Sequence, residues 1–272
     1  MCRWLGYTGS PILLDDLLFK PTNSLIHQSL LSKEGAEPTN GDGFGVGWYD
    51  DQPEPGVFKS IEPAWNDHNL AVLSRHIKSP LFLAHVRATT GTPIQKTNCH
   101  PFHYKNWMMV HNGVIYGFEK LKRDMAFTID PDLYYLIHGT TDSELLFYLA
   151  ITFGLEKNPK QALQVMAGFA EDLGRRNGQG KTIQMTLGIS DGERLMAVRY
   201  SSERKSRSLY HSTSIEAMKK INPDLARFSD DARAIVSEPL GDLREFWEEI
   251  PESSFVMIDK GRVTVEDFRP EI

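Results

Sequence analysis

The second residue of this chain is a cysteine, and its place beside the initiator methionine permits an N-terminal nucleophile. Removal of Met1 would leave Cys2 with its thiol and a free α-amine on one Cα atom. The thiolate is a strong nucleophile, and the amine, whose ordinary pKa is about 8, can accept the thiol proton directly or through a water. From position alone, Cys2 is more simply a residue of an N-terminal strand. The rest of the chain must therefore supply what amide cleavage still requires.

A nucleophilic attack on an amide also needs donors for the oxyanion, and His111-Asn112-Gly113 contains two candidates. The apolar run 107–110 predicts a buried strand that stops at His111, and Asn-Gly is a strong tight-turn signal. Such a turn can aim a backbone N–H of Gly113 outward, and the side-chain amide of Asn112 supplies a second donor. Taken alone, the tripeptide is more simply a hairpin turn.

Two charged residues could recognise the ends of a substrate that resembles an amino acid. Arg87 follows a predicted strand and precedes the small residues 88–91, where it could bind a carboxylate with two hydrogen bonds. Asp142 opens a predicted helix and could accept a ligand ammonium. The simpler roles are a structural ion pair for Arg87 and a helix cap for Asp142. Together with a cysteine and two oxyanion donors, they describe recognition of a γ-glutamyl group.

Two other kinds of site are not supported by the spacing. The histidines 85, 100, 103 and 111 and Cys99 lack the spacing of a zinc motif, so we predict no metal and no cofactor. Cys99 is interpreted as a buried thiol in a segment, 98–102, that anchors a loop under the pocket. The glycine-rich stretch 41–47 is not followed by Gly-Lys-Ser/Thr, so it predicts a strand with close backbone approach, beside the N-terminal strand, rather than a phosphate loop.

The order of predicted elements favours an α+β fold with largely antiparallel sheets. Strands are expected at 2–8, 57–61, 81–86, 107–110, 185–190, 195–200, 208–212, 234–237, 255–259 and 262–265, and the glycine-rich turn in 38–49 is expected to run into a further strand. Helices are expected at 13–19, 64–77, 142–153 and 160–177, with 24–31 a short helix or an extended edge. The apolar strands predict sheets that are covered on both faces. Because no linker or composition break interrupts the chain, we expect a single domain over residues 2–272.

Composition excludes several classes of partner. The net charge is -6 and the pI is about 5.9, so the composition does not indicate a basic surface that would bind nucleic acid or a membrane. Asp15 and Asp16 interrupt any signal sequence, and no apolar run approaches the roughly 20 residues of a membrane span. The two cysteines form no disulfide framework, so we expect a soluble cytoplasmic protein.

The chain resembles the class II glutamine amidotransferases over nearly its whole length, from Cys2 to about Arg262. The segments that carry the resemblance, in order, are 1–7, 41–48, 84–91, 98–102, 111–113 and 141–144. In addition, Ser237-Glu238-Pro239-Leu240 resembles a mark of the stand-alone YafJ-like branch, which is similar to the γ-glutamyl amidohydrolase of ergothioneine synthesis.

This resemblance implies a four-layer αββα sandwich of the N-terminal nucleophile hydrolase type. It implies that Cys2 is the nucleophile with its own amine as base, and that Asn112 and Gly113 form the oxyanion hole. Arg87 and Thr90 would hold the substrate carboxylate, Asp142 would hold the α-amine, and His111 belongs to the substrate-binding set. Family members that are linked to a synthase usually carry an aromatic residue and a histidine where this chain has Ala88 and Gly91. This departure favours a longer γ-glutamyl substrate.

We therefore expect an amidohydrolase that cleaves the γ-amide of glutamine or of a γ-glutamyl compound through a thioester on Cys2. One alternative is a glutaminase subunit whose acceptor domain is a separate partner chain. Another is a non-catalytic ligand-binding module that kept the fold. The sequence leaves the acceptor partner and homo-oligomer formation open.

Overall fold

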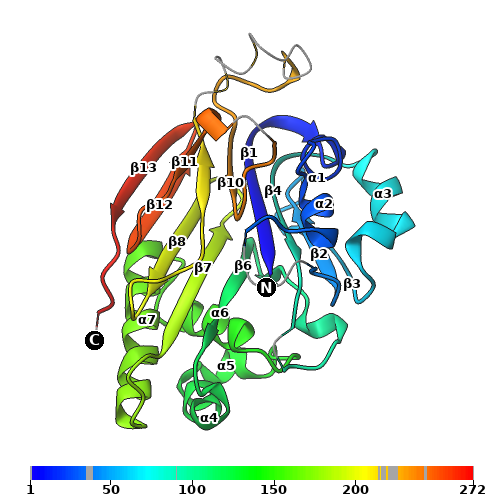
Figure 1. The fold of residues 1–272 in the computed structure, drawn as a ribbon. Helices are drawn as coiled ribbons and strands as arrows, with labels where there is room; N and C mark the ends of the chain where they lie inside the picture. Colours follow the sequence, from blue (N-terminus) through cyan, green and yellow to red (C-terminus); the bar gives the residue numbers. More distant parts are fainter. Residues whose placement is uncertain are drawn as a thin grey trace.

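The computed structural model describes residues 2–34, 39–89, 91–213, 215, 219, 226–241 and 244–271. In these ranges the strands pair into two antiparallel sheets (Figure 1). The seven-stranded sheet has the order β11-β9-β10-β1-β4-β2-β3, and the six-stranded sheet has the order β13-β12-β8-β7-β6-β5. The strands are β1 Arg3–Leu13, β2 Phe44–Trp48, β3 Gly56–Ser60, β4 Lys78–Val86, β5 Phe102–Tyr104, β6 Trp107–Ile115, β7 Ile183–Ser190, β8 Leu195–Ser201, β9 Tyr210–Ser212, β10 Arg233–Val236, β11 Trp247–Glu249, β12 Ser254–Asp259 and β13 Arg262–Asp267.

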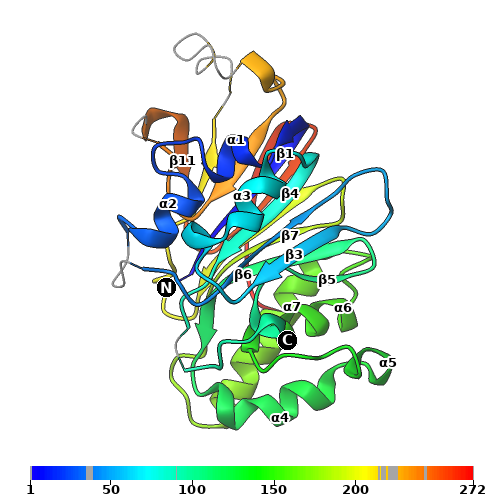
Figure 2. The same ribbon diagram turned by 90° about the vertical axis from the view of Figure 1, so that its right-hand side faces the viewer.

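The α-helices of the described residues form two groups, one on each sheet (Figures 1 and 2). The first group lies on the seven-stranded sheet and comprises α1 Asp15–Leu18, α2 Leu25–Leu30 and α3 His68–Ser74. The second group lies on the six-stranded sheet and comprises α4 Phe118–Thr128, α5 Pro131–Tyr134, α6 Asp142–Thr152 and α7 Pro159–Arg176. No helix in the described ranges is long and apolar enough to cross a bilayer.

Three separate hydrophobic clusters show that the layers stack as helix, sheet, sheet and helix. Alternate residues of one strand belong to different clusters, as the period of two in a strand requires. In β1, Leu5 packs toward the helices of its sheet, whereas Trp4 packs into the space between the sheets. In β6, Met109 packs toward α4–α7 and Met108 packs between the sheets. The predicted four-layer αββα sandwich is confirmed.

Several predicted elements have different limits in the structure. The first strand extends to Leu13 because it crosses a register irregularity between Thr8 and Ile12 instead of ending near Gly9. Strand β2 does not lie beside β1; it pairs with β3 and β4. Its glycines do allow the predicted close approach, since a Cβ on Gly45 would overlap the carbonyl oxygen of His100.

The predicted hairpin turn at Asn112-Gly113 is wrong. Strand β6 runs through both residues without a break, and it pairs with β7 from Met108 to Ile115. Neither residue has a positive φ, which a type I′ turn would require. The local turn preference is overridden because β6 is hydrogen-bonded along this whole length to a buried neighbour. By contrast, residues 191–192 and 260–261 do lie in the connections between consecutive strands.

Candidate active site

The Cys2 side chain lies at the start of β1 and is half-buried. Its Sγ lies 3.5 Å from the carbonyl oxygen of Ala88, in the segment that follows β4. Burial raises the pKa of the Cys2 thiol, and the positive charges of Arg87 and Arg3 offset this only in part. A thiol in such surroundings forms little thiolate unless a base removes its proton.

Arg87 is buried, and its guanidinium makes hydrogen bonds to neutral oxygens. These partners are the backbone oxygen of Asp42 at 3.3 Å and the hydroxyls of Thr89 at 3.2 Å and Thr92 at 2.6 Å. Within the described part of the chain, no carboxylate pairs with this guanidinium, which excludes a structural ion pair there. A buried guanidinium to which no carboxylate is directly bound is well suited to bind the carboxylate of a ligand.

The amide group of Asn112 offers an unused donor. Asn112 is buried, and its Nδ2 atom has no hydrogen-bond partner among the described residues. The backbone around it is fixed, because the Thr186 hydroxyl donates to the Asn112 carbonyl oxygen (3.3 Å) and accepts from the Trp4 indole nitrogen (3.2 Å). This chain of hydrogen bonds joins the strand of Cys2 to the strand of Asn112 across the two sheets.

The backbone N–H of Gly113 points away from β7. Residues of an antiparallel pair alternate between exchanging hydrogen bonds with the partner strand and pointing away from it. The backbone N–H of Tyr116 donates to the carbonyl oxygen of Thr182 on the β7 side. The N–H of Ile115 instead points away from β7 and donates to the Asp142 carboxylate at 2.8 Å. Gly113, two residues from Ile115, therefore directs its N–H to the same outer edge. Strand β5 covers that edge only at residues 107–109.

Three of the predicted side chains enter the space between the sheets at one end of the sandwich. Cys2 is two residues from Trp4, whose ring lies between the sheets, and Asn112 is two residues from Val110, which lies there also. Arg87 follows β4 at a position whose side chain points inward by the alternation of that strand. Its backbone N–H donates to the carbonyl oxygen of Gly43. The pairing of β1 with β4 and the hydrogen bonds through Thr186 thus bring the strand ends that carry the nucleophile candidate, the arginine and the amide donor to one end of the sandwich.

Asp142 and His111 lie where α6 begins beside the end of β6. The helix cap is Thr141, whose hydroxyl accepts from the N–H of Glu144, and Asp142 is the first helical residue. One Asp142 oxygen accepts from Ile115 N and the other from Ser143 N, both at 2.8 Å. The ring of His111 is buried, with Nδ1 2.8 Å from the Ser143 hydroxyl, and burial lowers its pKa.

The other residues that the sequence analysis named lie outside the described ranges or hold the structure around the site. Thr90 lies outside the described residues. Cys99 is a buried thiol, as expected, with Sγ 3.4 Å from the carbonyl oxygen of Ser60. Asn98 anchors its loop to the start of α6, since it donates to the Thr140 hydroxyl at 3.0 Å. No group of three or more His, Cys, Asp or Glu side chains in the described ranges is placed to hold a metal ion.

The sequence did not identify three residues that support this site. Thr186 holds both Trp4 and Asn112, and Asp42 accepts the N–H of Thr89 at 2.8 Å beside Arg87. Ser143 binds His111. Asp42 and Ser143 lie in the motif segments 41–48 and 141–144, but their partners lie in other segments, so the sequence did not indicate these contacts.

Comparison with known proteins gives a consistent result. The family model for class II glutamine amidotransferases matches residues 18–271. The chain is 31% identical to a probable glutamine amidotransferase, DUG3, of Saccharomyces cerevisiae, over 96% of this chain and 82% of that protein. It is also 34% identical to the γ-glutamyl-hercynylcysteine sulfoxide hydrolase of Mycolicibacterium smegmatis, over 42% of this chain and 52% of that protein.

Solved structures agree in fold. A glutamine aminotransferase class-II domain protein from Silicibacter pomeroyi superimposes with a TM-score of 0.78 and 33% identity, over the full length of both chains. The glutamine phosphoribosylpyrophosphate amidotransferase of Bacillus subtilis superimposes with a TM-score of 0.67 over 100% of this chain and 50% of that chain; at 15% identity, this likeness supports the fold alone. The chain belongs to the class II glutamine amidotransferase family, and it is an enzyme of that type.

Proposed function

We propose that this enzyme hydrolyses the γ-amide of glutamine or of a γ-glutamyl compound through a thioester on Cys2. The observation that carries the proposal is the unpartnered Nδ2 of Asn112 at the same end of the sandwich as the Cys2 thiol. Because an unpartnered buried donor costs free energy, its presence beside a nucleophile favours a role in binding an oxyanion. The names of the two relatives, an amidotransferase and a γ-glutamyl hydrolase, support the same chemistry.

The reaction begins at the free α-amine that removal of Met1 would give to Cys2. This amine takes the thiol proton, and the thiolate attacks the γ-carbonyl carbon of the substrate. Asn112 Nδ2 and the Gly113 N–H stabilise the negative charge that develops on the carbonyl oxygen. The C–N bond then breaks, the protonated amine gives its proton to the leaving ammonia or amine, and a thioester remains. Water, deprotonated by the same amine, attacks the thioester, and glutamate leaves as the thiol is restored.

The glutamyl end of the substrate would be held by two charged residues. The Arg87 guanidinium, which has no anionic partner in the described chain, binds the α-carboxylate, with Thr90 beside it. The Asp142 carboxylate binds the α-ammonium and uses lone pairs that remain beyond its two backbone contacts. His111 would keep the start of α6 in register with β6 through Ser143, as a neutral ring.

Intact-mass spectrometry with a glutamine-derived diazoketone, 6-diazo-5-oxonorleucine, tests this function. We expect a mass that lacks Met1 and a single covalent adduct that is absent in Cys2→Ala. Release of glutamate from glutamine and from γ-glutamyl dipeptides then ranks the substrates. If Met1 is retained and no adduct forms, the hydrolase proposal is wrong and a ligand-binding module is favoured. If ammonia is released only when a co-purifying chain is present, the protein is a glutaminase subunit.

A further inference from the structure

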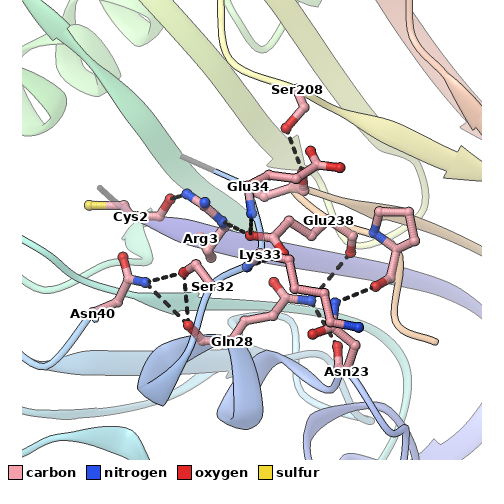
Figure 3. Close-up of polar contacts among 12 residues, drawn as sticks. Cys2, Arg3, Asn23, Gln28, Ser32, Lys33, Glu34, Asn40, Ser208 and Glu238 are labelled. Carbon is pink, nitrogen blue, oxygen red and sulfur yellow. Dashed lines mark hydrogen bonds and ion pairs between the residues drawn. The ribbon is translucent and has the colours of Figure 1, made fainter. Parts of the chain in front are cut away.

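Glu238 is buried against the N-terminal end of β1, although it lies in the last part of the chain (Figure 3). One of its oxygens accepts from Arg3 Nε at 2.7 Å, in an ion pair whose side chains are 5% and 1% exposed. The same arginine donates from Nη1 to the carbonyl oxygen of Cys2 at 2.9 Å. Arg3 thus connects the Glu238 carboxylate to the backbone of the nucleophile.

Glu238 also binds the loop between α2 and β2. Its two oxygens accept the backbone N–H groups of Lys33 and Glu34, each at 3.1 Å. Figure 3 shows this carboxylate between the loop and the Arg3 guanidinium, with Cys2 on the far side of Arg3. One carboxylate therefore joins the loop and the start of β1.

The segment that carries Glu238 is itself held firmly. The carbonyl oxygen of Pro239 accepts from Asn23 Nδ2 at 2.7 Å, and that of Glu238 accepts from Gln28 Nε2 at 3.3 Å. The carbonyl oxygen of Ser237 accepts from the Ser208 hydroxyl at 3.1 Å. Hydrogen bonds from two separate parts of the chain thus fix the backbone on both sides of the carboxylate.

The N-terminal end of β1 extends beyond its pairing with β10, so contacts other than strand pairing must hold it on that side. On its β10 side, β1 is paired through Leu5, and Trp4 exchanges two hydrogen bonds with Ser237, one with its backbone and one with its hydroxyl. The pairing with β10 does not reach Cys2 and Arg3, which lie at the chain end once Met1 is removed. On this side, the Arg3–Glu238 pair takes the place of a neighbouring strand.

We propose that Glu238 is a positioning residue for Cys2: it fixes the Arg3 guanidinium, which in turn fixes the Cys2 carbonyl group and hence the direction of the thiol. This inference rests on the proposed function, because it assigns a partner to the same nucleophile. A buried ion pair is weak evidence for a gain in stability, so its benefit here is a defined geometry. A displacement of the reacting atom by about 1 Å can lower a rate by about a hundredfold.

The test compares Glu238→Gln with the wild-type enzyme and with a matched control. Asp191→Asn is the control, because Asp191 also accepts two backbone N–H groups and an arginine, Arg194, but lies in the β7–β8 turn. In Glu238→Gln, we expect the rate of Cys2 labelling by the diazoketone and kcat to fall about tenfold or more, with KM within about twofold. Iodoacetamide needs no defined approach, so its reaction with Cys2 should change by less than about threefold.

Amide hydrogen exchange supplies a readout that does not depend on glutamine chemistry. The backbone amides of residues 3–5 and 33–34 should exchange faster in Glu238→Gln but not in Asp191→Asn. In addition, Glu238→Gln combined with Arg3→Gln should be no slower than Arg3→Gln alone, because both changes break the same link. If the wild-type protein reacts with iodoacetamide but not with the diazoketone or any γ-glutamyl amide, the proposed function fails, and the exchange data alone decide the inference. Unchanged exchange, or an active enzyme whose labelling rate and kcat survive Glu238→Gln, overturns the inference.

Discussion

At the scale of single residues, the candidate site contains a buried amide donor without a hydrogen-bond partner and a buried guanidinium without a bound carboxylate among the described residues. Asn112 Nδ2 is buried and unpartnered within the described residues, and the Arg87 guanidinium there contacts only neutral oxygens. Both arrangements are costly in a folded protein and become favourable when an anionic ligand fills the site. In the proposed function, this cost in stability is offset when the substrate binds and the transition state forms.

Replacement of Asn112 by alanine should mainly affect the chemical step. We expect kcat for γ-amide hydrolysis in Asn112→Ala to fall by about 10²–10³-fold, with KM within about threefold, because this donor acts on charge that develops in the transition state. Steady-state kinetics of glutamate release measures both parameters. Asn106→Ala is the control, since that amide donates to Asp191 in a distant turn and should leave kcat unchanged. A rise in KM with unchanged kcat would instead place Asn112 in ground-state binding.

At the scale of elements, the site is assembled by strands that meet across the two sheets. Strand β1 supplies Cys2, β4 leads into Arg87, and β6 supplies Asn112. Strands β1 and β4 pair within the seven-stranded sheet, whereas β6 belongs to the six-stranded sheet. The position of Asn112 relative to Cys2 and Arg87 therefore depends on contacts between the sheets. Thr186 provides one polar contact of this kind, and a Cβ on Gly188 would lie 2.7 Å from the Trp4 ring, so only glycine leaves room for that ring.

Thr186→Val should reveal how strongly the two sheets are linked. Valine keeps the shape of the side chain but leaves the buried Trp4 indole N–H without its acceptor. We expect the free energy of unfolding to fall by about 1–3 kcal/mol, the usual cost of an unsatisfied buried donor. Urea unfolding of Thr186→Val measures the loss, with Thr264→Val, whose half-buried hydroxyl bonds Met257 on β12, expected within about 0.5 kcal/mol of wild type. Equal effects of the two substitutions would contradict a special role for Thr186.

At the scale of the whole molecule, three buried histidines make the fold sensitive to acid. The rings of His85 and His100 are tilted against each other with centroids 4.0 Å apart, and His85 Nε2 lies 3.1 Å from the carbonyl oxygen of His111 on the other sheet. Burial lowers the pKa of His85 to about 3 and also lowers the pKa values of His100 and His111. The folded protein therefore keeps these rings neutral in conditions where the unfolded chain binds protons.

The free energy of unfolding should consequently be highest above about pH 6.5 and decrease as the pH falls. The pKa of His85 is lower in the folded protein than in the unfolded chain. His85 alone should therefore make the free energy of unfolding about 2 kcal/mol smaller at pH 5 than at pH 7. Urea titrations at pH 7 and pH 5 test this for the wild type and for His85→Gln, which should show a smaller difference. His68→Gln, a change at an exposed ring, should behave as the wild type. An equal difference in all three proteins would show that His85 does not contribute.

Local patterns in the sequence determined much of this protein. Apolar runs located most of the strands, and the start of α6 at residue 142 was predicted from the sequence, although its cap is Thr141 and not Asp142. The ordered motifs gave the family and the four-layer fold, which the comparisons and the structure confirm. The sequence missed α4, and it gave no reason to connect Glu238 with the nucleophile.

Only the tertiary structure decided the contacts that link distant segments. Asn112-Gly113 is a strand because pairing with β7 outweighs the turn preference of the two residues. Arg3 and Glu238 are separated by 235 positions, and Trp4 and Thr186 by 182, so no short-range pattern can encode either contact. Residue types fix which groups can react, whereas the packing of one sheet on the other fixes which of these groups meet.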